Sequence, residues 1–259
     1  MTDTLLEIEG LTKRFGGVIA SDGVDLVVPS GELHAVIGPN GAGKTTLIGQ
    51  LTGEIAPDAG QVRFDGRYIT ALPGWRRSQL GLARSFQITS LFLDFTALDN
   101  VALAVQAHAG HSFHFWREAR SEAELRAPAR AALARVGLAN RADAVVANMS
   151  HGEHRQLEIA MALATRPRML LLDEPMAGMG PEESSRMVGL LRELKQELTI
   201  LLIEHDMEAV FALADRITVL VYGRVIASGA PAAIRANAEV RQAYLGEQEQ
   251  VQEQVDRHG

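Results

Sequence analysis

The sequence predicts an α/β fold, with helices on a parallel sheet, an antiparallel β subdomain near the N-terminus and a helical subdomain at about residues 90–165. Three observations lead to this prediction. The first 70 residues read mostly as strands and turns, the chain becomes helical from about Thr96, and strands alternate with helices from about residue 151. Such alternation is typical of βαβ units, whose strands form a parallel sheet.

The N-terminal strands are indicated by apolar alternation between turn residues. The stretch LLEIEGLTKRFGG, residues 5–17, alternates and ends in a glycine pair. In VDLVVPSGELHAVIG, residues 24–38, a Pro-Ser-Gly turn separates two strands. In GQVRFDGRYI, residues 60–69, an Asp-Gly pair between two short runs predicts a β-hairpin.

The later elements follow from capping residues and helical periodicity. Thr96 is the expected N-cap of one helix, and the Ala-rich stretch at 121–138 predicts another. We expect further helices at 151–165, 182–197 and 206–214 and strands at 169–173, 199–204 and 216–222. We expect a single domain over residues 1–247 and a polar, flexible tail at 248–259.

Composition and charge exclude several classes of protein. The chain has 259 residues, 47% of them hydrophobic, and no cysteine, which excludes disulfides, zinc-thiolate sites and cysteine nucleophiles. The N-terminus does not resemble a signal peptide, and no apolar run approaches the roughly 20 residues that span a bilayer. A net charge of −7 without a dense basic block argues against nucleic acid as a partner. We expect a soluble protein, or one held at a membrane by a partner.

The strongest motif is a phosphate-binding loop (P-loop), which follows an apolar strand and precedes an apolar-periodic helix. It matches G-x-x-x-x-G-K-[ST]. Glycines let backbone N–H groups approach a phosphate closely, and the helix N-terminus adds donors and a positive dipole end. We expect Lys44 to reach the β- and γ-phosphates and Thr45 to ligate Mg²⁺. The spacing and context disfavour the alternative, a glycine-rich turn without a ligand. The other expected nucleotide-binding residues are Gly38, Pro39, Asn40, Gly41, Ala42, Gly43 and Thr46.

Two adjacent acids end the buried strand in RMLLLDEP. Asp173 suits a role near Mg²⁺, and Glu174 suits positioning or deprotonation of an attacking water. An exposed strand-end pair is the alternative, which the upstream P-loop disfavours. Pro175 stops the strand, so both carboxylates lie at the carboxyl edge, where α/β proteins bind ligands.

A histidine and a glutamine are weaker candidates. His205 ends the strand in TILLIEHD, and we expect it to contact a γ-phosphate as a donor. A lone histidine is more often structural. Gln87, in LARSFQITSLF, offers a carbonyl oxygen to Mg²⁺ or water, and spacing alone leaves that role open.

The stretch MSHGEHRQLEIA, residues 149–160, permits two interpretations. Two histidines and a glutamate in HGEH suggest a metal site, but no third ligand of suitable spacing is evident. Ser150 and Glu153 form the S-x-x-E pattern of a capping box, which predicts a helix N-terminus. We prefer the second interpretation.

Taken together, these motifs resemble those of the ATP-binding subunit of ABC transporters, over nearly the whole chain to about Glu247. GPNGAGKTT is similar to Walker A, SFQ to the Q-loop, MSHGEHRQLEIA to the signature motif, LLLDEP to Walker B and IEHD to the switch histidine. Phe15 stands where that family stacks an aromatic ring on adenine. KRFGG, RSFQ, RQLEIA, LLIEHDM and the terminal AYLGE resemble the subfamily that serves branched-chain amino acid importers and the related urea or amide importers. The insert around HAGHSFHFWREARSEAELR resembles the larger of that system's two ATPase subunits.

The resemblance implies a P-loop NTPase core and an ATP hydrolase that uses ATP and Mg²⁺. The residues expected at the metal would be Asp173, Thr45 and Gln87. The residues expected to take part in hydrolysis would be Glu174, His205 and Gln87. It also implies two ATPase subunits, identical or different, paired head to tail, so that Ser150 and Gly152 of one face the γ-phosphate held by the other. Two integral membrane permease subunits and, indirectly, a solute-binding protein would complete the assembly at the cytoplasmic face of the inner membrane.

The chain departs from the family pattern in two places. His151 stands at a glycine position of the signature, and the segment MAGMG, residues 176–180, replaces the usual D-loop, with Gly180 at its aspartate position. Two rival functions stay open: an ABC ATPase outside transport that acts as an assembly factor, and a P-loop kinase for a small molecule. The signature helix and His205 argue against the kinase.

Overall fold

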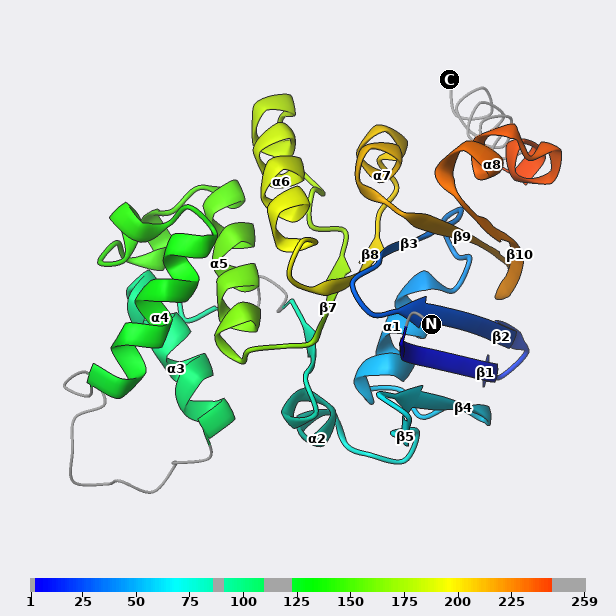
Figure 1. Cartoon of the computed structure of the whole chain (residues 1–259), viewed down its shortest axis with the longest axis horizontal. Coiled ribbons are helices and arrows are strands. Elements are labelled where there is room, and N and C mark those ends of the chain that lie inside the picture. Colours follow the sequence, from blue (N-terminus) through cyan, green and yellow to red (C-terminus); the bar gives the residue numbers. More distant parts are fainter. Residues whose placement is uncertain (1–2, 86–90, 110–122, 244–259) are drawn as a thin grey trace. The chain divides into compact units, whose positions relative to one another are not determined.

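The computed structural model describes residues 3–85, 91–109 and 123–243, and these divide into two compact units. The first unit consists of Met1–Pro73 and Lys195–Gly259, and the second of Gly74–Leu194. Figure 1 labels their helices and strands. Among the described residues, no helix is both long and apolar enough to cross a membrane. The predicted helical segment at about 90–165 falls within the second unit, and the domain boundaries stay a prediction.

The first unit contains an antiparallel sheet of four strands in the order β2-β1-β4-β5. These are β1 (Thr4–Phe15), β2 (Val18–Pro29), β4 (Ala59–Phe64) and β5 (Arg67–Tyr68). Asp65 and Gly66 both have positive φ, 52° and 71°, between β4 and β5. That is the backbone of a tight two-residue hairpin, so the predicted Asp-Gly turn is confirmed.

A second group of strands in this unit carries the P-loop. The strand β3 (Leu33–Ile37) pairs in parallel with β8 (Thr199–Ile203) on one side and β9 (Arg216–Val221) on the other. Every residue of β3 and of β8 is buried, as expected of strands covered on both faces. β10 (Arg224–Gly229) adds antiparallel to β9. The helices of the unit are α1 (Lys44–Thr52), α7 (Met207–Leu213) and α8 (Pro231–Ala236).

The second unit combines a short parallel strand pair with a group of helices (Figure 1). β6 (Leu82–Arg84) pairs with β7 (Met169–Asp173), and α3, α4 and α5 pack against one another. The helices are α2 (Gly74–Gln79), α3 (Ala97–Ala109), α4 (Ala123–Arg135), α5 (His151–Ala164) and α6 (Pro181–Leu194), with short 3₁₀ helices η3 (Ala139–Arg141) and η4 (Val146–Asn148). The side chain of Thr96 accepts the N–H of Asp99, as predicted for the start of α3.

The predicted elements are present, and most differences lie at helix ends. The ranges 151–165 and 206–214 include capping residues, which lack helical dihedrals: Thr165 is the C-cap of α5, and Asp206 and Ala214 cap α7. α6 begins one residue earlier than expected because Pro181 is compatible with the first helical position. It ends at Leu194, three residues short of the expected end.

Candidate functional site

The P-loop connects β3 to α1 within the first unit. Gly43 is the N-cap of α1 and has a left-handed backbone, with φ 102°. Ala42 is buried and its N–H donates to the Pro39 carbonyl, whereas Asn40, Gly41 and Thr45 are exposed and Thr46 is partly exposed. The loop is thus a tight turn that leaves one side open to solvent, where a phosphate has access to it.

Two glycines of the loop are required by close backbone contacts. A Cβ at Gly43 would lie 2.1 Å from the carbonyl oxygen of Ala20, and one at Gly38 would lie 2.0 Å from that of Leu220. Both distances are far inside van der Waals contact, so no side chain fits at either position. The glycines therefore serve the packing of the loop as well as its approach to a ligand.

The Lys44 ammonium group lies inside the loop. Its Nζ donates to the carbonyl oxygens of Gly38 at 2.5 Å and Pro39 at 2.9 Å, and the residue is only 8% exposed. A lysine that is held this way presents a positive charge at the position where the motif binds phosphate.

The turn between β9 and β10, distant in sequence, holds the P-loop through a backbone hydrogen bond. Tyr222 and Gly223 connect β9 to β10 with φ values of 47° and 78°. The Gly223 N–H donates to the Ala42 carbonyl at 2.9 Å, and the Gly223 carbonyl accepts the Asp22 N–H at 2.9 Å. Arg224 then pairs with Asp22, with Nη2 2.6 Å from Oδ2. Sequence reasoning missed this support because no motif marks the turn.

Phe15, the predicted adenine-stacking residue, ends β1. Its side chain is exposed, and the Lys13 Nζ lies 5.4 Å from the centroid of its ring. An exposed ring face of this kind is available to a planar base.

The two acids of the Walker B segment lie in the second unit, at the end of β7. Asp173 Oδ2 lies 3.0 Å from Nη2 of Arg84, and both side chains are mostly buried. Glu174 has φ 49°, a left-handed conformation that is costly for a residue with a side chain. Its carbonyl accepts the N–H of Ala177 at 3.1 Å. Backbone strain of this kind is frequent at functional positions.

His205 lies in the first unit, just beyond β8. Its side chain is 63% exposed, and its backbone N–H donates to the buried carboxylate of Glu204 at 3.0 Å. Asp206 then caps α7 by accepting the N–H groups of Glu208 and Ala209. Glu204 and Asp206 together fix the backbone on both sides of His205, while the imidazole faces solvent.

The signature stretch is a capped helix start, as predicted. The Ser150 side chain accepts the Glu153 N–H at 3.2 Å, and the Glu153 carboxylate accepts the Ser150 N–H at 2.8 Å. Arg141 Nε donates to Glu153 at 2.7 Å. Burial raises the pKa of Glu153, but the bonds from Ser150 and Arg141 outweigh it, so this pKa lies below its usual value. Glu153 is therefore ionised and holds Ser150 in place.

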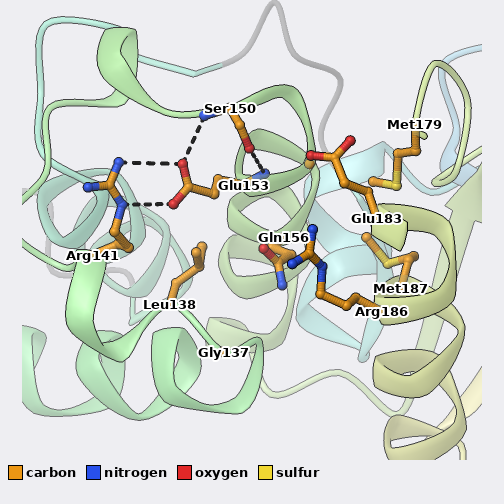
Figure 2. A pocket seen from close by; sticks show the side chains of 11 residues that line it. Gly137, Leu138, Arg141, Ser150, Glu153, Gln156, Met179, Glu183, Arg186 and Met187 are labelled. Carbon is orange, nitrogen blue, oxygen red and sulfur yellow. Dashed lines mark hydrogen bonds and ion pairs between the residues drawn. The ribbon is translucent and has the colours of Figure 1, made fainter. Parts of the chain in front are cut away.

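A pocket of about 340 Å³ opens beside this helix start (Figure 2). Ser150 and Gly152 lie on its wall together with Glu183 of α6. A Cβ at Gly152 would lie 2.7 Å from the Glu183 carboxylate, so a side chain at this position would displace the end of Glu183.

The histidines of HGEH are engaged with backbone carbonyls. His151 Nε2 lies 3.1 Å from the Ala177 oxygen, and His154 Nε2 lies 2.7 Å from that of Val146. Glu153 is paired with Arg141. The three side chains therefore have separate partners, and in the described part of the chain no group of three His, Asp or Glu residues is suited to a metal ion.

Three sequence predictions lie outside the described residues. They are Gln87, most of the insert after residue 109, and the polar tail.

Comparison with known proteins identifies the family. The family model described as ABC transporter matches residues 21–177, more than half of the chain. The chain belongs to the ABC transporter family. A second model, described as branched-chain amino acid ATP-binding cassette transporter, matches residues 224–250.

Curated relatives of this ABC ATPase match over almost its whole length. It is 42% identical to the high-affinity branched-chain amino acid transport ATP-binding protein BraF of Pseudomonas aeruginosa, over 95% of this chain and 100% of that one. It is 39% identical to LivG of Escherichia coli K12, a protein with the same description, with the same coverage. Among solved structures, the ADP conformation of an ATP-binding cassette from an ABC transporter matches with a TM-score of 0.84 and 30% identity, over 94% of this chain and 99% of that one.

Family membership confirms the predicted P-loop α/β fold and the enzyme class. As a member of this family, the chain binds ATP and hydrolyses it. ATP-binding subunits of ABC transporters work with membrane permeases and form dimers.

Proposed function

We propose that this ABC ATPase powers an importer for branched-chain amino acids or a related small polar solute. The observation that carries the proposal is its 42% identity, over essentially full length, to an ATP-binding protein of branched-chain amino acid transport. The match of residues 224–250 to the branched-chain family supports it independently, because that segment lies outside the matched ATPase region.

The proposed chemistry is Mg²⁺-dependent hydrolysis of the γ-phosphate. Lys44 and the P-loop backbone hold the phosphates, and the hydroxyl of Thr45 ligates Mg²⁺. Gln87 and Asp173 contribute further oxygens near the metal, because Mg²⁺ prefers oxygen ligands such as those of carboxylates and amides. Phe15 stacks on the adenine.

Glu174 is proposed to activate the attacking water and His205 to donate to the γ-phosphate. The left-handed backbone of Glu174 and the exposed imidazole of His205 support these roles. Ser150 and the Gly152 N–H, at the positive end of α5, serve the nucleotide of a partner subunit. Donors that are preorganised toward developing charge lower a barrier by roughly 3 kcal/mol each.

We assign the permease contact to an exposed apolar patch of Phe92, Leu93, Phe95 and Val145. The rings of Phe92 and Phe95 stack 5.4 Å apart, and the N–H of Val146, next to Val145, donates to the Phe95 carbonyl. Each of the four side chains is more than a third exposed. Contiguous apolar surface of this kind supports a protein–protein contact. We propose two permease subunits and a second ATPase subunit, identical or different, as partners at the cytoplasmic face of the inner membrane.

The catalytic assignment is tested by Glu174→Gln. We expect ATP hydrolysis to fall at least about a hundredfold while ATP binding persists, because the amide keeps the shape of the side chain and loses its basicity. Glu193→Gln, on the exposed face of α6, is the matched control and should hydrolyse ATP like the wild type. A turnover of Glu174→Gln within a few fold of wild type would reject the assignment.

The transport assignment is tested by purifying the tagged chain from gently solubilised membranes. Two multi-span proteins and a second ATPase should accompany it, and Phe92→Asp should reduce their recovery. Co-purification with soluble proteins alone would reject the transport role and leave the ATPase chemistry standing.

A further inference from the structure

The two departures of this chain from the family pattern contact each other. His151, at the first position of α5, places its Nε2 3.1 Å from the carbonyl oxygen of Ala177, in the segment that replaces the D-loop. A carbonyl only accepts, so Nε2 is the protonated donor. The neutral ring protonated at Nε2 and the imidazolium both donate from this atom, so the bond does not depend on the charge of the ring.

A glycine in this segment, Gly178, makes room for the imidazole of His151. Gly178 has φ 77°, and a Cβ there would lie 3.3 Å from His151 Nε2 and 3.7 Å from its Cδ2. A side chain at this position would therefore be strained and would also press on the imidazole. The glycine of MAGMG and the histidine of the signature thus fit each other sterically.

The contact continues to the proposed water-activating residue. The N–H of Ala177 donates to the carbonyl of Glu174 at 3.1 Å, which closes a turn over residues 174–177. Two hydrogen bonds, one to the carbonyl and one from the N–H of Ala177, therefore connect His151 to Glu174 through the backbone of this residue. Glu174 has a left-handed backbone, and a conformation of this cost persists only where surrounding contacts hold it.

We propose that His151 is a positioning residue for ATP hydrolysis. By holding the Ala177 carbonyl, it fixes the turn that sets the direction of the Glu174 side chain. The contact would then keep the N-terminal turn of α5 and the turn that carries Glu174 fixed relative to each other. This inference rests on the proposed role of Glu174.

The test compares His151→Ala with His151→Gln in the full chain, with His154→Ala as the matched control. His154 lies on the same helix, but its Nε2 bonds to Val146 instead. We expect His151→Ala to lower kcat about tenfold at unchanged KM for ATP, since misplacement of a reacting group affects the chemical step. His151→Gln keeps an N–H donor and should recover most of the rate. His154→Ala should keep the wild-type kcat.

A readout independent of activity is hydrogen–deuterium exchange of the peptide covering residues 174–180. Exchange there should rise in His151→Ala and stay unchanged in His154→Ala. A wild-type kcat in His151→Ala, a change confined to KM, equal losses in the Ala and Gln variants, or unchanged exchange would each overturn the inference. An active Glu174→Gln enzyme would instead reject the proposed role of Glu174, while the exchange result would still report on the contact of His151.

Discussion

The guanidinium of Arg84 holds the carboxylate of Asp173, with Nη2 3.0 Å from Oδ2, at the end of β7. One oxygen of the proposed magnesium-binding carboxylate is therefore already engaged with a positive charge. Arg84 ends β6, the strand that pairs with β7, so the ion pair follows from the register of these two strands.

Removal of this charge should strengthen metal binding. In Arg84→Gln, the Mg²⁺ concentration for half-maximal ATP hydrolysis should fall at least about threefold, because a cation no longer competes for Asp173. Arg63→Gln, which loses its pair with Glu7 on the antiparallel sheet, is the control and should leave the Mg²⁺ dependence unchanged. An unchanged or higher Mg²⁺ requirement in Arg84→Gln would contradict the prediction.

Gly43→Ala should abolish nucleotide binding. The new methyl would meet the Ala20 carbonyl at 2.1 Å, and the left-handed backbone alone costs roughly 1–2 kcal/mol. Gly31→Ala has a comparable φ of 80° and nothing within 4 Å of the added Cβ. We expect both variants to melt at a lower temperature and only Gly43→Ala to lose ATP affinity, as measured by calorimetry. If Gly43→Ala bound ATP at wild-type affinity, the prediction would be wrong, because the P-loop would then move away from the Ala20 carbonyl without losing its ligand.

Ser150 has a structural role and a proposed catalytic role, which two substitutions separate. Ser150→Ala removes the cap and should lower the unfolding free energy by about 1 kcal/mol. Ser150→Asp retains a capping oxygen and should keep the stability of the wild type, but it places a negative charge where a γ-phosphate is expected. Both should lower ATP hydrolysis about a hundredfold. An active Ser150→Asp enzyme would remove Ser150 from the site.

Glu158 should make stability depend on pH. Burial raises the pKa of this α5 residue to about 7 from 4.5, against the attraction of Arg155, whose Nη1 lies 3.1 Å away. The native state then binds more protons than the unfolded state between these values, so stability is lost as pH rises from about 4.5 to about 7.

The variant Glu158→Gln stays neutral throughout this range and isolates the effect. Its unfolding free energy relative to wild type should increase by up to about 3 kcal/mol between pH 4.5 and pH 7, and then level off. Denaturant titrations at several pH values measure this difference, with Glu193→Gln as the exposed control. A difference that does not change with pH would contradict the raised pKa.

Local features could be predicted from the sequence because their residues are neighbours in the chain. The capping box of Ser150 and Glu153 and the Asp65–Gly66 turn each depend on a few consecutive positions with fixed chemistry. The P-loop was predicted for the same reason, since its spacing determines the backbone path between one strand and one helix.

Contacts between distant segments could not be predicted. Arg84 with Asp173, Gly223 with Ala42 and His151 with Ala177 join positions that no periodicity relates. Their partners are fixed by strand register and by the turns between elements, which depend on the packing of the whole unit. The role of Gln87 stays a prediction, since it lies outside the described residues.

The pairing of β3 also determines when the nucleotide-binding loop can form during synthesis of the chain. The P-loop leaves the ribosome before β8 and β9, because these flanking strands of β3 begin only at Thr199 and Arg216. The Gly223 N–H, which donates to the Ala42 carbonyl, is synthesised later still. Contacts of such sequence separation form only after the intervening chain has emerged. A nascent chain that has not yet reached Gly223 carries the motif without a completed nucleotide loop, so we expect ATP binding only after this residue has emerged.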